Sequence, residues 1–310
     1  MRDAFVAKLA ELAAGNPRMA LITGDLGFGV LTKFAKDFPD QFINAGVAEQ
    51  NMTALACGMA LSGWKTYTYS IANFTTLRCL EQIRNDVCYH EADVCVVSVG
   101  AGFSYGQLGM SHFATEDLAI MRALPGMRVV TPAERWEVED LTEQLSAEPG
   151  PAYLRIDKGI GGTERRDGER ARLGRARLVR EGFDVSLLSV GAILRESVAA
   201  AERLAEVGIS AEVISFPSIK PIDVDAIVAT AQKTGRMVTV EEHTVIGGLG
   251  AAVAEICLEA GVGIKAFKRI GLQDRYPSVV GDQDFLRAHY GMDAGAIVAA
   301  VECMVGARSQ

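Results

Sequence analysis

The chain alternates short apolar runs with longer segments that are apolar on one side, which is the pattern of strands followed by helices. In its first half the strand candidates are 20–23, 41–44, 94–99, 128–131 and 152–156, and the helix candidates are 49–61, 115–124 and 134–145. The run 94–99 is rich in β-branched residues and ends at Gly100, as expected of a parallel strand buried on both faces. Strands and helices that alternate at this spacing predict a parallel sheet covered on both faces.

The same alternation restarts in the second half, after a stretch with few large apolar residues. That stretch, 157–182, contains Arg165, Arg166, Arg170, Arg172, Arg175 and Arg177. We interpret it as a solvated linker, with a nucleic-acid-binding patch as the alternative. Strand candidates follow at 185–190, 211–216, 237–241 and 264–270, with helix candidates at 196–207, 222–231 and 251–260.

The pattern therefore predicts an α/β protein made of two doubly wound domains. The first domain should span residues 1–160 and the linker 161–182, and a smaller second domain should span 183–310. A chain of 310 residues with 49% hydrophobic content is long enough to bury two cores.

Charge and composition narrow the class of protein. The formal net charge of −8 argues against general nucleic-acid binding, which needs a basic face. No apolar run reaches the ~20 residues of a membrane span, and the first residues lack the pattern of a signal peptide. The six cysteines form no CxxC pair, so we interpret them as reduced packing residues. We expect a cytoplasmic enzyme that acts on small metabolites.

The segment 42–51, Phe-Ile-Asn-Ala-Gly-Val-Ala-Glu-Gln-Asn, places the carboxylate of Glu49 between a strand and an apolar helix. Ligands bind at the carboxyl ends of strands in open parallel sheets, so this position suits a functional acid. The alternative is a helix N-terminal residue that only complements the helix dipole.

Further motifs occur in the same order as in a known family. Segments 24–26, 46–50, 73–85, 109–112, 116–125 and 131–132 resemble the pyrimidine-binding domain of transketolases and deoxyxylulose-phosphate synthases. Segments 241–250 and 274–276 resemble the transketolase C-terminal domain. The resemblance covers nearly the whole chain and implies thiamine diphosphate as cofactor.

The resemblance also implies roles for particular residues. Glu49 would bind N1′ of the cofactor's aminopyrimidine, because a buried carboxyl group with a raised pKa can share a proton there. Phe74 would pack on the aminopyrimidine ring, unless it is only a core residue after a strand. Asp25, in the motif Gly24-Asp25-Leu26, would lie in the cofactor-binding region.

Two more residues would handle the substrate. The resemblance places Arg78 where an arginine binds a terminal phosphate, and the alternative is a surface pair with Glu81 on one helix face. It places His112 as a substrate contact and proton donor, and the alternative is a side chain that stabilises its loop.

Several positions depart from the family pattern. Gly100 stands where transketolases usually carry a histidine, Gln107 and Leu108 replace a Glu-Asp pair, and Gly29 replaces a serine that helps bind phosphate. The cofactor-binding residues match better than the sugar-binding ones. We therefore expect a modified ketose or an unusual acceptor.

The diphosphate-binding half of the family is missing from this chain. We find no Gly-Asp-Gly stretch followed by a later Asn, the residues that hold a divalent cation on the diphosphate. The resemblance thus implies a partner subunit that holds Mg²⁺, an α2β2 assembly and no metal ligand here. Together the subunits would transfer a two-carbon ketol unit from a ketose, perhaps phosphorylated, to an aldehyde. The alternatives are a 2-oxo acid dehydrogenase beta subunit and a non-catalytic homologue.

Overall fold

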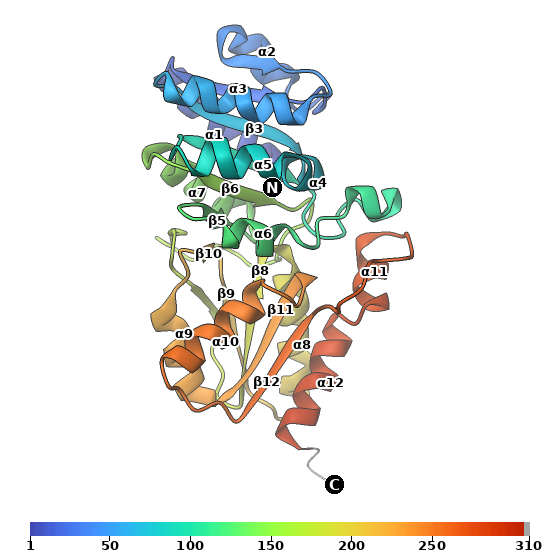
Figure 1. Ribbon diagram of the computed structural model, residues 1–310. Helices are drawn as coiled ribbons and strands as arrows, with labels where there is room; N and C mark the ends of the chain where they lie inside the picture. Colours follow the sequence, from blue (N-terminus) through green and yellow to red (C-terminus); the bar gives the residue numbers. More distant parts are fainter. Residues whose placement is uncertain (307–310) are drawn as a thin grey trace.

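The computed structural model describes residues 1–306 and shows two stacked α/β units (Figure 1). The first unit contains a seven-stranded sheet with the order β10-β5-β6-β4-β3-β1-β2, parallel throughout except for β10. Its strands are β1 (Met19–Thr23), β2 (Phe42–Asn44), β3 (Lys65–Ile71), β4 (Val94–Val99), β5 (Arg128–Val130), β6 (Ala152–Ile156) and β10 (Ser218–Lys220).

The second unit contains a five-stranded sheet with the order β12-β11-β8-β9-β7, parallel except for the edge strand β7. Its strands are β7 (Arg177–Arg180), β8 (Val185–Val190), β9 (Ala211–Ser215), β11 (Arg236–Thr244) and β12 (Ala266–Leu272).

Helices cover both faces of each sheet. In the first unit α1 packs on α7 on one face while α3 packs on β3 on the other, and in the second α8 pairs with α12 and α9 with α10. The α-helices are α1 (Arg2–Gly15), α2 (Thr32–Asp37), α3 (Glu49–Leu61), α4 (Ala72–Thr75), α5 (Leu80–Gln82), α6 (Asp117–Ala123), α7 (Arg135–Ala147), α8 (Leu194–Glu206), α9 (Val224–Thr234), α10 (Leu249–Glu259), α11 (Gln283–His289) and α12 (Ala294–Val305). The remaining turns are 3-10 helices at Pro39–Gln41, Leu77–Cys79, Gly106–Leu108, Met110–His112 and Gly191–Ile193, and a π-helix at Ile83–Cys88.

The predicted fold class, two doubly wound α/β domains, is confirmed. The prediction missed β3, which lies in the middle of the first sheet between β1 and β4. Its sequence, Lys-Thr-Tyr-Thr-Tyr-Ser-Ile, is unusually polar for a central strand, yet residues 65–70 are all buried. Tyr67 and Tyr69 supply the apolar surface on one side, and both rings lie near Phe5 of α1.

The segment expected to be a linker contributes one strand. Arg177–Arg180 forms β7, the half-buried edge of the second sheet, and pairs antiparallel with β9. A charged edge strand is consistent with the arginine-rich sequence, because charge on an edge discourages pairing with other chains. Conversely β10, from the second half of the chain, pairs antiparallel with β5 of the first sheet. The two units therefore exchange backbone hydrogen bonds as well as side-chain contacts.

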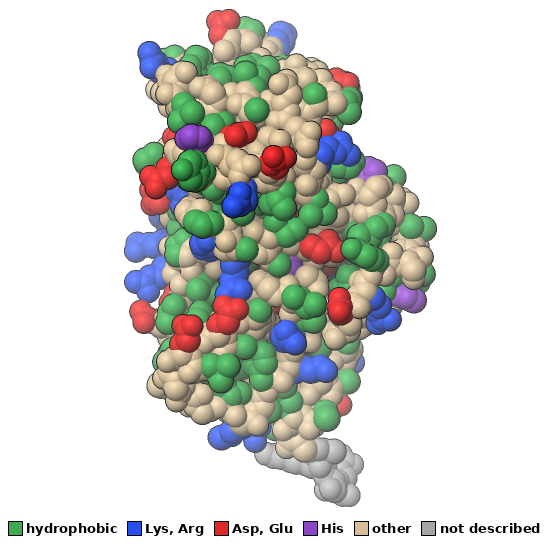
Figure 2. All heavy atoms as spheres, in the orientation of Figure 1, with side chains coloured by type: hydrophobic (Ala, Val, Ile, Leu, Met, Phe, Trp, Pro, Cys, Tyr) green, Lys and Arg blue, Asp and Glu red, His purple; other side chains and the backbone are tan. Residues whose placement is uncertain are grey.

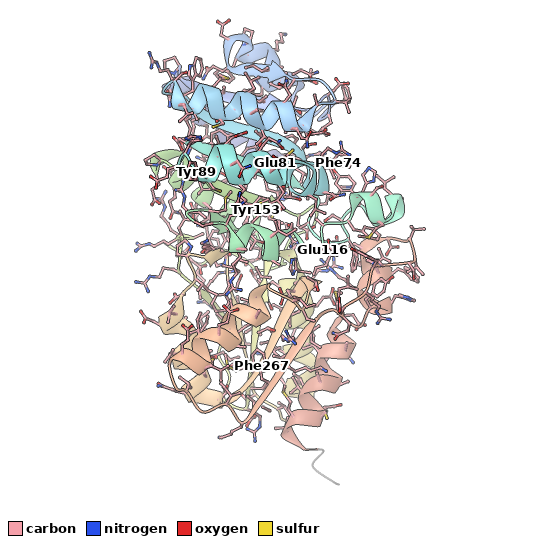
Figure 3. All side chains as sticks on the ribbon, viewed as in Figure 1. Phe74, Glu81, Tyr89, Glu116, Tyr153 and Phe267 are labelled. Atoms are coloured by element: carbon pink, nitrogen blue, oxygen red, sulfur yellow. The ribbon has the colours of Figure 1, made fainter. Side chains whose placement is uncertain are left out.

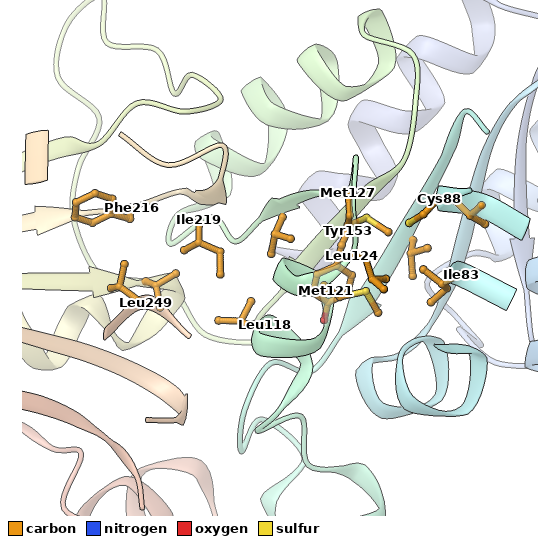
Figure 4. Close-up of a cluster of buried hydrophobic side chains, with 14 of the residues drawn as sticks. Ile83, Cys88, Leu118, Met121, Leu124, Met127, Tyr153, Phe216, Ile219 and Leu249 are labelled. Atoms are coloured by element: carbon orange, nitrogen blue, oxygen red, sulfur yellow. The ribbon is translucent and has the colours of Figure 1, made fainter. Parts of the chain in front are cut away.

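An apolar cluster continues across the boundary between the units (Figure 4). Leu118 and Met121 of α6 and Ile219 of β10 lie in the same buried cluster as Phe216 and Leu249 of the second unit. Burying such side chains is worth roughly 1.5–3 kcal/mol each, so the contact holds the two units in a fixed arrangement.

Three further findings concern the helices, the surface charge and the cysteines. In residues 1–306, no helix has both the length and the apolar character needed to cross a membrane. Lys and Arg side chains are interspersed with Asp and Glu on the face that Figure 2 shows. Five of the cysteines are buried and none forms a disulfide among the described residues.

Candidate active site

Four adjacent parallel strands bring the predicted site residues to one edge of the first sheet. Strands β2, β1, β3 and β4 are neighbours and run in the same direction, so their carboxyl ends meet at this edge. Asp25 follows β1, Glu49 follows β2, Phe74 follows β3 and His112 lies in the long loop after β4. Figure 3 shows Phe74 on α4 at this edge.

Glu49 is a buried acid at a helix start. It is the first residue of α3, and only 4% of its side chain is exposed. The positive end of the helix dipole favours a carboxylate there. Gly24 makes room for it, since a Cβ on Gly24 would lie 3.2 Å from Glu49 Cγ. The Glu49 side chain therefore packs closely against the turn after β1.

Arg78 binds Glu49 directly. Its Nη1 donates a hydrogen bond of 2.9 Å to Glu49 Oε2, and its guanidinium carbon lies 4.3 Å from the centre of the Phe74 ring. Gln50 holds the backbone of this turn by donating to the Arg78 carbonyl at 3.1 Å. The pair with Glu81, the alternative considered from the sequence, does not form within residues 1–306, because Arg78 reaches across to α3 instead.

His112 completes a row of contacts on the other side of Phe74. The two rings lie 5.2 Å apart in an edge-to-face arrangement. Ser111 Oγ is 2.9 Å from His112 Nδ1, and Asn73 Nδ2 donates to the Ser111 carbonyl at 2.8 Å. Burial lowers the pKa of His112 below its ordinary value. A neutral imidazole can accept a proton as well as donate one, which suits a substrate contact.

Asp25 lies at the margin of this group. It adopts a left-handed backbone conformation with φ 57°, uncommon for a residue other than glycine. Its amide and carboxylate pair with the Asn44 side chain at 3.0 and 2.9 Å, which ties the ends of β1 and β2 together. Among the described residues Asp25 has no hydrogen bond to Glu49, Arg78 or His112. The structure thus brings four of the five predicted residues into one chain of contacts.

Tyr105 is a neighbour of the site that the sequence did not single out. Its ring centre is 6.2 Å from that of His112, and Lys158 Nζ lies 3.5 Å from the Tyr105 ring centre. The ring fills the space above Gly100, where an added Cβ would collide with it. The sequence signal that could have pointed to Tyr105 is Gly100, because a glycine in place of a histidine leaves room for a side chain from elsewhere. In the structure Gly100 has φ 94°.

Comparisons with known proteins identify the family of the chain. The family model described as "Transketolase, pyrimidine binding domain" matches residues 1–162, and "Transketolase, C-terminal domain" matches residues 174–297. The chain belongs to the transketolase family. The resemblance stated from the sequence is confirmed.

Its relatives include both separate subunits and longer enzymes. One subunit of an apulose-4-phosphate transketolase, from Phocaeicola vulgatus, is 36% identical over 96% of this chain and 94% of its own length. A 6-deoxy-6-sulfo-D-fructose transketolase subunit of a Clostridium species is 35% identical over 97% and 92%. A solved split-gene transketolase, described as an inactive beta4 tetramer, superposes with a TM-score of 0.87 at 34% identity and covers 99% of this chain and 98% of its own. The chain spans only 47% of 1-deoxy-D-xylulose-5-phosphate synthase 1 of Geobacter sulfurreducens, at 35% identity.

The site residues fit the pyrimidine half of thiamine diphosphate, the cofactor of transketolases and deoxyxylulose-phosphate synthases. The position of the Arg78 guanidinium supports this fit. This flat group with N–H donors lies on Phe74 and donates to Glu49. An aminopyrimidine is also flat and, when protonated at N1′, also donates to a carboxylate. The same two side chains therefore present the stacking face and the acceptor that such a ring requires.

The described residues of this chain offer no comparable site for the metal that accompanies diphosphate. Within residues 1–306, His, Cys, Asp and Glu side chains form no group of three or more arranged to hold a metal ion.

Proposed function

We propose that this chain is the pyrimidine-binding subunit of a thiamine diphosphate-dependent transketolase. The enzyme transfers a two-carbon ketol unit from a ketose or ketose phosphate to an aldehyde acceptor. The observation that carries the proposal is the buried carboxylate of Glu49 at the start of α3, with the Phe74 ring joined to it through Arg78. Membership of the transketolase family supports the transferase chemistry.

Each side chain of the group has a distinct task. Bound thiamine diphosphate supplies the nucleophilic carbon that the reaction needs. Glu49 would hold the aminopyrimidine at N1′ and share a proton there, which would polarise the ring. Phe74 supports the face of the ring. His112 contacts the substrate and exchanges a proton with a hydroxyl, while Arg78 leaves Glu49 to meet a terminal phosphate.

A partner subunit supplies the diphosphate-binding half and holds Mg²⁺, in an α2β2 assembly. Three observations support this. The chain lacks the Gly-Asp-Gly motif, it spans about half of a related full-length synthase, and its relatives include split-gene subunits. In addition, every loop at the site edge exposes a large apolar side chain: Phe28 after β1, Val47 after β2, Leu77 after β3 and Leu108 after β4. Exposed apolar groups gathered at one edge are typical of a surface that a partner covers.

The substrate differs from that of an ordinary transketolase. Gly100 and Leu108 remove an imidazole and a carboxylate from the loop that should read the sugar hydroxyls, and Tyr105 takes part of the space. Two relatives are named for unusual ketoses, apulose 4-phosphate and 6-deoxy-6-sulfo-D-fructose. A modified ketose as donor is therefore the substrate class that we propose.

The test is reconstitution with a diphosphate-binding transketolase subunit, sought among the products of neighbouring genes. The pair should bind thiamine diphosphate with Mg²⁺ by calorimetry and form ketol-transfer products from a panel of ketose phosphates and aldehydes. Glu49→Ala should reduce turnover by roughly 10²–10⁴-fold, the contribution of general acid–base catalysis. Glu81→Ala, at an exposed acid of the neighbouring helix α5, is the matched control.

Three results would count against the proposal. Near-normal turnover of the Glu49→Ala pair would remove the role of Glu49. Release of carbon dioxide from 2-oxo acids, without ketol transfer, would instead assign the chain to the beta subunits of 2-oxo acid dehydrogenases. Failure of the pair to bind cofactor would favour a non-catalytic homologue.

A further inference from the structure

The loop that carries His112 is held by the second unit of the protein. The loop runs from Gly102 to Ala114, whose backbones form an isolated antiparallel bridge of two hydrogen bonds, at 3.1 and 3.0 Å. Inside this bridge the side chains of Phe103 and Phe113 are fully buried in the core of the second unit. Phe103 lies 5.2 Å from Phe113 and 5.5 Å from Tyr290, measured between ring centres.

A buried acid of β11 contacts the start of this loop. Glu242 is 2% exposed, and its Oε1 accepts a hydrogen bond of 2.5 Å from the Phe103 amide. Gly102 is obligatory beside it, since an added Cβ would collide with the Glu242 carboxylate, and its φ of 53° is also left-handed. The carboxylate therefore packs directly against the backbone of the loop.

Other charged and polar groups hold Glu242 in place. Arg287 of α11 donates to Glu242 Oε2 through Nε, and Gln283 Nε2 lies 2.9 and 3.1 Å from the two carboxylate oxygens. Asp157, at the end of β6, accepts from Ser104 Oγ in the loop at 2.7 Å. Desolvating a buried ion pair is costly, and only well-formed hydrogen bonds offset that cost, so the bonds from Arg287, Gln283 and the Phe103 amide fix the position of the carboxylate.

The far part of the loop is supported by the same segment. The backbone amide of Gly281 donates to the Gly106 carbonyl at 3.4 Å, and an added Cβ on Gly106 would collide with the Gly281 carbonyl oxygen and Leu286. The residues that precede His112 thus rest on 281–287 of the second unit. By contrast, Glu49 begins α3 and pairs with Arg78, and Phe74 lies on α4, all within the first unit.

We propose that Glu242 is a positioning residue for His112: through the Phe103 amide and Arg287 it makes the C-terminal domain the support of the substrate-contacting loop. The catalytic value of that position rests on the role proposed above for His112, but the placement itself does not. Loss of the carboxylate should release the loop while Glu49 and Phe74 stay in place.

The experiment measures His112 directly in the full-length chain, alone and with its partner subunit. Diethyl pyrocarbonate modifies accessible histidines, and peptide mass spectrometry reports the rate at His112 relative to exposed His90. Glu242→Ala should raise that ratio roughly tenfold, as expected when a hydrogen bond to a charged group no longer opposes local opening. Glu242→Gln keeps an oxygen for the Phe103 amide and should restore most of the protection.

Two controls separate positioning from general destabilisation. Ile227→Ala removes a buried side chain of α9, away from the loop, and should lower the melting temperature without changing the His112 ratio. Gly102→Ala should raise the ratio, whereas Gly168→Ala, at a similar φ of 73° but with no atom within 4 Å of the added Cβ, should not. Equal His112 ratios in Glu242→Ala and wild type, with only the melting temperature lowered, would overturn the proposal.

Reconstituted pairs give the functional readout. Glu242→Ala should lower kcat for ketol transfer and raise KM for the substrate, with the affinity for thiamine diphosphate largely retained because Glu49 and Phe74 lie on α3 and α4, outside the released loop. A loss of cofactor affinity as large as the loss of kcat would overturn the positioning role. If the wild-type pair shows no ketol transfer, the proposed function fails, and the His112 ratio still decides whether Glu242 holds the loop.

Discussion

Glu137 should make the stability of this protein fall as the pH rises from about 4.5 to 7. The residue lies in the first turn of α7, where Glu134 and Glu137 form a reciprocal capping box. Glu137 Oε2 accepts hydrogen bonds from the amides of Ala133 at 2.6 Å and Glu134 at 3.2 Å. Its side chain is fully buried, and this burial raises the pKa of Glu137 from 4.5 to about 7, although both amides and Arg177 favour the charged form.

Proton linkage gives the sign and the size of this change in the free energy of unfolding. Between pH 4.5 and 7 the unfolded chain has released the Glu137 proton while the folded chain still binds it, so raising the pH favours unfolding. Above pH 7 both states are ionised and the dependence ends. A pKa that moves from 4.5 to about 7 corresponds to a loss of about 3 kcal/mol across this window.

The assay compares Glu137→Gln with wild type, because burial raises the pKa of other acids as well and their contributions cancel in the difference. Glutamine keeps an oxygen for the two amides and carries no proton to release. In urea titrations the variant should gain about 3 kcal/mol over wild type between pH 4.5 and 8. Glu143→Gln removes a charge from the solvent side of the same helix and controls for net charge. A difference between Glu137→Gln and wild type that is constant with pH, or that shrinks as the pH rises, would refute the reasoning.

Three further predictions concern the site and its supports. Arg78→Met should tighten thiamine diphosphate binding in the reconstituted pair by a few fold, because a half-exposed ion pair of roughly 0.2–1 kcal/mol no longer competes for Glu49; weaker binding in calorimetry would contradict this. Asp117→Ala should cost about 3–5 kcal/mol in urea titrations, since it leaves the buried Arg155 guanidinium unpaired. Adding Arg155→Met to Asp117→Ala should recover part of that loss, and a purely additive double variant would argue against the pair. Tyr105→Ala should raise the pKa of His112 toward 6.5 by exposing its ring, measured from the pH dependence of diethyl pyrocarbonate modification.

The fold class was accessible from the sequence because most strands are continuous apolar runs. The strands at 94–99 and 152–156, and the helix Glu49–Leu61, have the bounds that the pattern predicts. The strand Lys65–Ile71 was missed because Thr and Tyr side chains fill its interior. These side chains carry hydroxyl groups, so a simple hydrophobic count underrates their aromatic and methyl surface. The short antiparallel strands at Arg177–Arg180 and Ser218–Lys220 depend on partners far along the chain, which local periodicity does not register.

In the candidate site, too, the sequence predicted which residues belong together but missed a contact between residues far apart in the chain. The resemblance assigned Glu49, Phe74 and His112 to one site, and the structure does bring them into a row of contacts. Spacing along a helix, however, offered Glu81 as the neighbour of Arg78, whereas the chain folds Arg78 back onto α3. The contact between Arg78 and Glu49 joins residues 29 positions apart, which only the folded chain reveals.

The two sets of side chains in this site have separate supports, and that separation explains how one set can change while the other does not. Glu49 begins α3 and Phe74 lies on α4, so the backbone that carries both follows strand ends of the first sheet, although His112 of the loop 102–114 touches the Phe74 ring. That loop is fixed at Phe103 and Phe113 by the second domain, which leaves its tip, including Leu108, free to vary without loss of the anchors. Replacement of sugar-reading side chains therefore needs no rearrangement of the cofactor-activating acid. A family built in this way can acquire new ketose substrates at the loop while its chemistry stays with Glu49.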